Sequence, residues 1–471
     1  MVLVTGGVTD PTPGDDEFKC LNLNIAVPTE NGEIKSEGLP VMVWIHGGAF
    51  NYGANSVSRY RPTKLALLAQ AQGNPIIIVS IQYRLGPLGF GFSSDLASSE
   101  PKSSEPKSSE PNSTDGNFGF VDQIHALEWV RDHISSFGGN PRNLTAFGVS
   151  AGSASIHHHI LSGSPLFDRA ILMSGSAPTL GPLPVDLYER AWSTFMKKSG
   201  ISRACKTATE RIEMARNISA EELIANFTSA PMGPMADGVL LPENWDWKAE
   251  QKETRCKEII IGDTKIEAII MDGLIAAVPH KRLLEILKDH SSIVPDTDGF
   301  LRAFGINIKD KGDMQGDAYR DTMRCFLSVG MFQYPAMLVA RTFPGKVYFY
   351  HFDEPSPFPG PTLGLPYHGQ CALFVYQNSV ADAPEEARKT AEAMGKIWTS
   401  FAAKREDFEP WEEMKLKGRF MRLGPMGQLS LRNWEKGGDV DGGREYSWLP
   451  WVEHNFDSVK DLTRVLTIRV D

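Results

Sequence analysis

The sequence predicts an α/β fold in which a mostly parallel central sheet is flanked by helices, and three observations predict it. Residues 41–45, 76–81 and 144–147 are short runs of apolar residues, typical of strands buried on both faces. Segments with helical periodicity or turn residues separate these runs, as parallel sheets require. The third observation is a strand, a sharp turn and a helix in direct succession over residues 143–161.

The turn in this last stretch is Gly-Val-Ser-Ala-Gly, residues 148–152. Glycine on either side of Ser150 lets strand and helix approach without a Cβ clash, so Ser150 can occupy a strained backbone conformation with its hydroxyl above the sheet. The N–H of Ala151 then lies at a helix N-terminus. A chain with 43 glycines produces such a pentapeptide by chance, so its position between strand and helix carries the prediction that Ser150 is a nucleophile.

Composition excludes several classes of partner. The chain has 471 residues, of which 41% are hydrophobic, and a net charge of −10. An acidic chain is a poor ligand for nucleic acid or for an anionic membrane surface, and no apolar run approaches the ~18 residues of a membrane span. We therefore expect no nucleic-acid partner and no membrane span, while the oligomeric state stays open. No linker divides the chain, so residues 1–471 are predicted to form a single domain.

The five cysteines are odd in number and scattered, which favours free thiols in a reducing compartment. No signal peptide is visible at the start of the chain. Asn-x-Ser/Thr sequons at residues 112, 143, 217 and 226 favour secretion instead. We expect a cytoplasmic protein if Met1 is the true start, and a secreted one if the beginning is truncated.

Further elements follow from periodicity. Strands are expected at residues 20–27, 170–173, 259–261 and 346–352, and amphipathic helices at residues 120–134 and 391–401. Residues 98–112 repeat a Ser-Ser-Glu-Pro unit without apolar residues and are predicted to be a flexible surface loop. Residues 185–255 are polar with helical periodicity, which predicts a helical cap. No element is assigned beyond about residue 402.

A serine nucleophile needs a histidine base, which in turn needs a carboxylate that orients it. Asp263 and Glu267 both follow the strand at residues 259–261, and His368 follows the strand at residues 346–352, which is the order acid then base. The residues alone leave the choice of acid open. The loop His-Gly-Gly-Ala-Phe at residues 46–50 can offer backbone N–H groups to a developing oxyanion.

The three consecutive histidines at residues 157–159 are not predicted to bind a metal. Consecutive positions on a helix splay apart, so the side chains do not converge on one ion. We expect them to be surface histidines or satisfied core histidines.

The chain resembles the type-B carboxylesterases of the cholinesterase-like group, within the α/β-hydrolase fold. The matching stretches are residues 20–28, 40–50, 83–90, 116–123, 137–141, 148–152 and 174–177. The resemblance is dense from residue 21 to 177 and sparser to about residue 401. It implies that Glu267, five residues after Gly262, is the acid, and that His368, followed by an aromatic-rich strand at residues 374–376, is the base.

What the resemblance implies for function is a serine esterase that cleaves a small-molecule or lipid-like ester through an acyl-enzyme, with Ser150, Glu267 and His368 as its catalytic triad. The N–H groups of Gly48, Ala49 and Ala151 would form the oxyanion hole. No metal or organic cofactor is implied. The alternative is a catalytically impaired or non-catalytic cholinesterase-like interaction protein.

The sequence departs from the family at several places. Val149 replaces a glutamate that relatives carry just before the nucleophile, and Ala268 replaces a glycine after the acid. Relatives also begin with a longer antiparallel segment, which contains the cysteine that pairs with the equivalent of Cys20 in secreted members. We therefore expect an exposed sheet edge beside residues 21–27 and a marginally stable or aggregation-prone chain.

Overall fold

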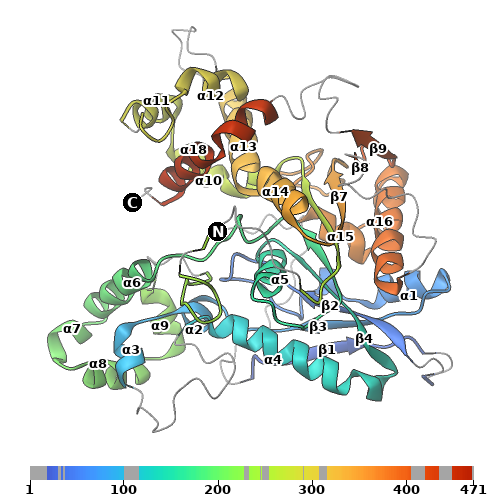
Figure 1. The fold of residues 1–471 in the computed structure, drawn as a ribbon, viewed down its shortest axis with the longest axis horizontal. Coiled ribbons are helices and arrows are strands. Elements are labelled where there is room, and N and C mark those ends of the chain that lie inside the picture. Colours follow the sequence, from blue (N-terminus) through green and yellow to red (C-terminus); the bar gives the residue numbers. More distant parts are fainter. Residues whose placement is uncertain are drawn as a thin grey trace. The chain divides into compact units, whose positions relative to one another are not determined.

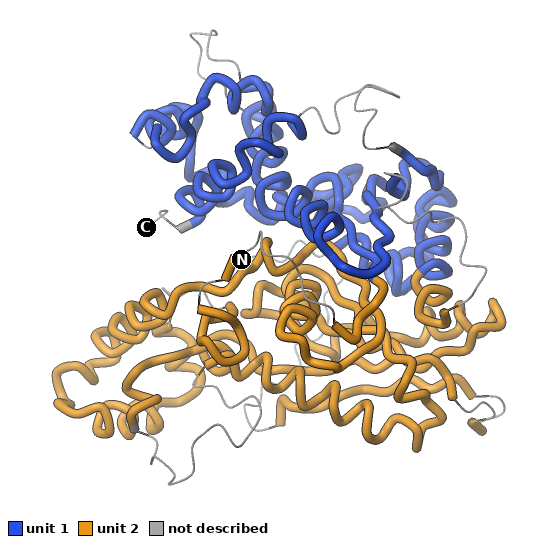
Figure 2. Tube along the Cα trace, in the orientation of Figure 1, with its two compact units in different colours: residues 1–9, 259–397, 406–471 blue, residues 10–258, 398–405 orange. Residues whose placement is uncertain are grey.

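The computed structural model describes residues 19–29, 33–34, 38–99, 116–227, 233–243, 245–246, 254–289, 291–306, 316–404, 419–433 and 448–468. These residues fall into two compact units (Figure 2). Unit 2 comprises residues 10–258 and 398–405, and unit 1 comprises residues 1–9, 259–397 and 406–471. We describe each unit by itself.

The sheet of unit 2 has the strand order β1-β3-β2-β4-β5. Its strands are β1 (Leu23–Ala26), β2 (Leu39–Ile45), β3 (Ile77–Ile81), β4 (Gly139–Val149) and β5 (Arg169–Met173). The pairs β2–β3, β2–β4 and β4–β5 are parallel, and β1 runs antiparallel to β3. All residues of β3 and β5 are buried. These strands confirm the mostly parallel, doubly covered sheet that the apolar runs predict.

Helices surround this sheet (Figure 1). They are α1 (Thr63–Ala71), α2 (Gly86–Phe90), α3 (Ser94–Ser99), α4 (Phe118–His133) and α5 (Ala151–Leu161), with the short 3-10 helices η1 (Ser58–Tyr60) and η3 (Ile134–Phe137). The α4 helix buries Ile124, Leu127 and Val130, as its periodicity predicts. The α5 helix contacts β2, β4 and β5, so its first turn is anchored to three adjacent strands.

A second group of helices follows in unit 2, in the predicted cap region. It consists of α6 (Val185–Lys198), α7 (Ile201–Ala204), α8 (Ala208–Arg216) and α9 (Ala220–Asn226). These helices share a small apolar core that includes Phe195, Ile201 and Phe227. Among the described residues of the region predicted as a cap, residues 185–255, the last helix ends at Asn226, and residues 233–243, 245–246 and 254–255 contain no helix.

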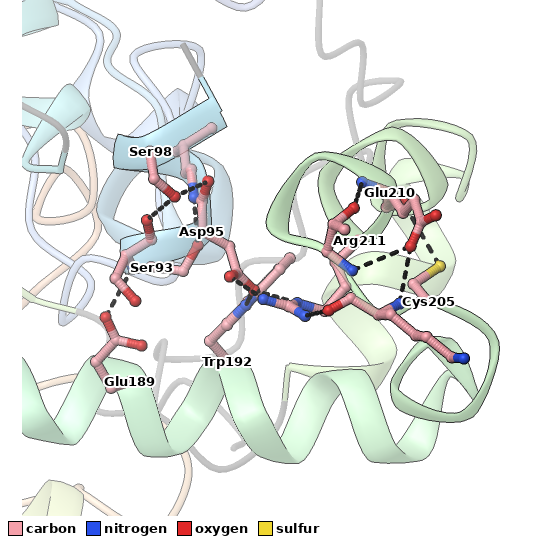
Figure 3. A network of polar contacts seen from close by, with 12 residues as sticks. Ser93, Asp95, Ser98, Glu189, Trp192, Cys205, Glu210 and Arg211 are labelled. Atoms are coloured by element: carbon pink, nitrogen blue, oxygen red, sulfur yellow. Dashed lines mark hydrogen bonds and ion pairs between the residues drawn. The ribbon is translucent and has the colours of Figure 1, made fainter.

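Polar contacts tie this helical group to α3 (Figure 3). The Asp95 carboxylate accepts hydrogen bonds from Trp192 Nε1 at 2.8 Å and from Arg211 Nε at 2.7 Å. The hydrogen bond from Arg211 holds the pKa of Asp95 below its usual range. Glu189 of α6 also accepts a hydrogen bond from the Ser94 N–H at 2.7 Å. Residues 98 and 99 of the predicted repeat loop belong to α3, and residues 100–112 lie outside the described residues.

The strands of unit 1 follow the order β6-β7-β8-β9. They are β6 (Glu258–Thr264), β7 (Lys346–Phe352), β8 (Arg419–Leu423) and β9 (Leu429–Asn433). The β7–β8 pair is parallel, and β8–β9 is antiparallel. The first two strands confirm the prediction for this region, whereas no element was predicted where β8 and β9 lie.

Helices of unit 1 fill the intervals between these strands. They are η4 (Glu267–Met271), α10 (Asp272–Ala277), α11 (His280–Asp289), α12 (Thr297–Ala303), α13 (Asp317–Ser328), the π-helical turn η5 (Val329–Gln333), α14 (Tyr334–Thr342), α15 (Gln370–Tyr376), α16 (Glu385–Ala403) and α18 (Leu449–Ile468). The α16 helix begins in unit 1 and its residues from Trp398 onward belong to unit 2; its predicted face, with Ala391, Met394, Trp398 and Phe401, is buried. Among the described residues, no helix combines the length and apolar character that crossing a membrane requires.

One sequence prediction in this unit is wrong. Residues 374–376 were expected to form an aromatic-rich strand, but they form the last turn of α15. Phe374, Val375 and Tyr376 are all fully buried. A short continuous apolar run is compatible with a buried strand and with a buried helix, so its pattern does not distinguish the two.

Candidate active site

Ser150 lies at the turn between β4 and α5, and its backbone is strained. Its φ of 57° and ψ of −123° lie in a region that residues with a side chain rarely adopt. A Cβ on Gly148 would lie 2.7 Å from the Gly152 carbonyl carbon, and one on Gly152 would lie 2.0 Å from the Ile45 oxygen. Both glycines are therefore required for the close approach of strand and helix, as the sequence predicts.

A second glycine contact holds the turn from the side of β5. A Cβ on Gly175 would lie 2.3 Å from the carbonyl oxygen of Ser150. The Ser153 hydroxyl donates to the Gly175 oxygen at 2.5 Å, and the Ser150 N–H donates to the Met173 oxygen at 2.9 Å. The strained conformation at Ser150 is thus maintained by β5 and its following loop, a role that the sequence pattern does not reveal.

The loop that follows β2 approaches Ser150 closely. A Cβ on Gly47 would lie 3.1 Å from Ser150 Cβ and 2.4 Å from the Val149 oxygen. Gly48, Ala49 and Phe50 all have positive φ, at 121°, 53° and 60°. The backbone of the predicted oxyanion loop and the predicted nucleophile are therefore in contact within one unit.

The predicted oxyanion donors are available for a ligand. Ala151 is the first residue of α5, and the first N–H groups of a helix have no intrahelical acceptor. Within the described ranges, the N–H groups of Gly48, Ala49 and Ala151 have no hydrogen-bond partner. Free N–H groups beside a serine hydroxyl are what stabilisation of a tetrahedral oxyanion requires.

His46 and Tyr83 stabilise this loop. The Tyr83 hydroxyl donates to the His46 oxygen at 2.9 Å, and the two rings stack with centroids 4.5 Å apart. Burial lowers the pKa of His46 to about 4, so the imidazole is neutral at pH 7. The Gly86 N–H also donates to the Phe50 oxygen at 2.7 Å. The loop conformation is therefore fixed by buried hydrogen bonds.

The predicted acid and base are in contact within unit 1. Glu267 begins η4 just after β6, and its Oε2 lies 2.5 Å from His368 Nδ1. The side chains of Glu267 and His368 are 0% and 8% exposed. The Thr264 N–H donates to Glu267 Oε1 at 2.6 Å, and the Phe332 ring lies 4.8 Å from the His368 ring. An Nδ1–H donated to a carboxylate leaves Nε2 as the basic nitrogen.

The other candidate acid has a different partner. Asp263 Oδ1 lies 2.5 Å from Nδ1 of His351, a residue of β7. Of the two carboxylates that the sequence left open, Glu267 is therefore the one that contacts His368. Ser150 belongs to unit 2 and His368 to unit 1, and the approach of Ser150 to His368 stays a prediction.

The three histidines of α5 are core residues with hydrogen-bond partners. His158 Nε2 donates to the Leu180 oxygen at 2.9 Å, and His159 Nε2 donates to Gln123 Oε1 at 2.8 Å. His157 Nδ1 accepts from the Ala177 N–H at 3.0 Å. Of the two predicted alternatives, surface histidines and satisfied core histidines, the structure shows core histidines, each with at least one ring nitrogen in a hydrogen bond. Across the described residues, no cluster of His, Cys, Asp or Glu has the arrangement of a metal site.

These buried histidines predict a loss of stability in mild acid. Burial lowers the pKa of His158 to about 4 and that of His159 to about 3. The unfolded chain takes up these protons below about pH 6.5, whereas the folded chain does not, so acid favours unfolding. We expect the free energy of unfolding to fall by about 1.4 kcal/mol per pH unit for each such histidine between about pH 6.5 and 4.

Urea unfolding at pH 7.5, 6 and 5 measures this dependence. His159→Gln keeps a side-chain amide beside Gln123. It should reduce the number of protons taken up on unfolding by about one, and so make the free energy of unfolding less dependent on pH. His454→Gln, at an exposed histidine of α18, is the matched control and should leave it unchanged. A wild-type stability that is constant from pH 7.5 to 5 would contradict the prediction.

Comparison with known proteins gives the following findings. The model of a family described as "Carboxylesterase family" matches residues 8–436. The chain is 32% identical to a pyrethroid hydrolase, Ces2a, of Mus musculus, over 81% of this chain and 67% of the relative. It is 28% identical to a para-nitrobenzyl esterase of Bacillus subtilis (strain 168), over 81% and 73% of the two chains. Acetylcholinesterase of Bungarus fasciatus is 29% identical, over 83% of this chain and 65% of that relative.

The fold also has a solved counterpart. A PNB esterase structure superimposes with a TM-score of 0.65 and 23% identity, covering 90% of this chain and 85% of the other. At this identity the similarity establishes a shared fold.

Proposed function

Because the chain belongs to the carboxylesterase family, whose members share the α/β-hydrolase fold, we propose that it hydrolyses carboxylic esters through an acyl-enzyme formed on Ser150. The observation that supports this most strongly is the strained backbone of Ser150, at φ 57°, in contact with the oxyanion loop. Strain of this kind costs of order 1–3 kcal/mol and persists where function requires it. The buried Glu267–His368 pair supplies the base that a serine nucleophile needs.

In the proposed reaction, His368 Nε2 accepts the proton of the Ser150 hydroxyl as its oxygen attacks the ester carbonyl. Glu267 stabilises the resulting imidazolium through Nδ1–H. The N–H groups of Gly48, Ala49 and Ala151 bind the negative charge on the tetrahedral oxygen. The imidazolium then gives its proton to the leaving alcohol, and the acyl group remains on Ser150. Water, deprotonated by His368, hydrolyses the acyl-enzyme and restores the serine.

The proposed steps involve no cofactor. They require only proton transfer and nucleophilic attack, and the chain's own residues supply both.

We propose a small-molecule or lipid-like carboxylic ester as the substrate. The names of the relatives, a pyrethroid hydrolase and a para-nitrobenzyl esterase, support this class of substrate.

Partitioning of the acyl group tests the acyl-enzyme directly. Several esters with one acyl group and different alcohols are hydrolysed in the presence of methanol, and the ratio of methyl ester to free acid is measured. A common acyl-enzyme predicts the same ratio for every starting ester, because the alcohol has left before the partition. A ratio that changes with the leaving alcohol, or no hydrolysis above the buffer rate, would contradict the proposal.

A further inference from the structure

Unit 1 contains a second buried histidine–carboxylate pair that the proposed reaction does not use. Asp263 of β6 and His351 of β7 meet at 2.5 Å, Oδ1 to Nδ1. Their side chains are 1% and 3% exposed. A buried ionisable pair is weak as a source of stability, because an apolar pair of similar volume is often as stabilising. The pair therefore invites a role beyond the packing of two strands.

The pair is part of a polar cluster that spans three strands. Lys265 and Asp353 follow Asp263 and His351 by two residues and lie just past the ends of β6 and β7. Lys265 Nζ lies 2.9 Å from Asp353 Oδ1. Arg422 of β8, whose Cα pairs with that of His351, donates to Asp353 through Nε at 3.0 Å. Charged groups of alternating sign thus connect the ends of β6, β7 and β8.

This cluster flanks the amide that holds the proposed acid. The Thr264 N–H donates to Glu267 Oε1 at 2.6 Å, and it belongs to the peptide bond that follows Asp263. Asp263 on one side contacts His351 of β7, and on the other side the Lys265 N–H donates to the oxygen of Phe352 in β7 at 3.0 Å. Gln333 of the π-helical turn donates to the Lys265 oxygen at 3.1 Å. The position of the Thr264 amide, and with it the orientation of the Glu267 carboxylate, depends on these anchors.

We propose that Asp263 and His351 are positioning residues, which hold the Thr264 amide where it orients the Glu267 carboxylate toward His368. This inference rests on the proposed function of Glu267 and His368. A correctly oriented carboxylate stabilises the imidazolium that forms during attack. Misplacement of such a group by about 1 Å costs about 10²-fold in rate. Loss of the pair should lower kcat and leave KM nearly unchanged, because the side chains of Asp263 and His351 are buried.

The test compares His351→Leu, which leaves Asp263 without this donor, with His351→Gln, which retains a side-chain N–H. Asp263→Asn is a second variant of the same shape as the native residue. Val347→Ala, at a fully buried position on the same strand, is the matched control for lost stability alone. Turnover is divided by the number of active sites, titrated with an organophosphonate ester, so that misfolded molecules do not count.

We expect His351→Leu and Asp263→Asn to lower kcat per active site by about 10²-fold, with KM changed by less than about twofold. The acidic limb of the kcat/KM profile should move to lower pH, because a misoriented Glu267 stabilises the His368 imidazolium less. His351→Gln should restore most of kcat. Val347→Ala should lower the melting temperature and leave both kcat per site and the pH profile unchanged.

Two results would overturn the inference, one seen in the variants and the other in the wild-type chain. If the His351 and Asp263 variants only melt earlier, as Val347→Ala does, with unchanged kcat per site and pH profile, the pair is structural. If the wild-type chain itself has no turnover and no titratable site, the proposed function fails, and this inference fails with it.

Discussion

Replacement of Ser150 by alanine is expected to lower ester turnover by about 10⁶-fold, because no other group in the proposed reaction attacks the ester carbonyl to form the acyl-enzyme. Alanine carries the same Cβ as serine, so the strained backbone at φ 57° and its packing against Gly175 are unchanged. The variant should therefore fold like the wild type. Hydrolysis of a short acyl p-nitrophenyl ester measures turnover, and circular dichroism melting checks the fold.

Ser162→Ala is the matched control for this experiment. Ser162 follows the last turn of α5, and its hydroxyl donates to the His159 oxygen, at the end of the helix opposite Ser150. It should retain wild-type turnover. More than a few per cent of activity in Ser150→Ala would exclude Ser150 as the nucleophile.

The second large effect is expected for Glu267→Gln, which should lower kcat by about 10⁴-fold. The glutamine oxygen can still accept from the Thr264 N–H, which places the amide NH₂ against His368 Nδ1. Two donors cannot face each other, so the imidazole takes the tautomer with its proton on Nε2. Nε2 can then no longer accept the proton of the Ser150 hydroxyl.

The comparison with Asp263→Asn decides between the two candidate acids. Asp263 contacts His351, so its replacement should cost about 10²-fold, far less than that of Glu267. Steady-state kinetics of both variants at saturating ester measure the difference. If Glu267→Gln kept near-normal turnover while Asp263→Asn lost it, the assignment of the acid would be reversed.

Much of unit 2 could be predicted from sequence because its signals are local. The apolar runs in β2, β3 and β4 have no alternation, which is typical of strands covered on both faces. The conformation of Ser150 follows from the small residues around it, since larger ones would clash with Ile45 or Val149. These features need no knowledge of distant contacts.

The last third of the chain was harder because its elements depend on tertiary contacts. In β8, the buried residues Phe420 and Met421 stand between two arginines, and Arg422 pairs with Asp353, the residue that follows β7. The α15 helix is buried throughout, so it has no exposed face that a helical period could reveal. Helix α18 does bury a helical series, Val452, Phe456, Val459, Leu462 and Leu466, which was detectable in the sequence but not assigned.

The two candidate acids show the same difference between local sequence signals and tertiary contacts. Asp263 lies near the end of β6 and Glu267 just after it, and only the three-dimensional contacts show that one meets His351 and the other His368. His351 was not singled out, although a histidine inside an otherwise aromatic and apolar strand is a signal of a buried polar partner.

Covalent labelling with an organophosphonate ester, followed by mapping of the modified peptide, tests the central claim most directly. Such reagents react with a serine only where a base and an oxyanion hole activate it. The account predicts one label per chain, on Ser150, and none on Ser150→Ala. A folded wild-type chain that is not labelled, or a label on a different serine, would contradict it.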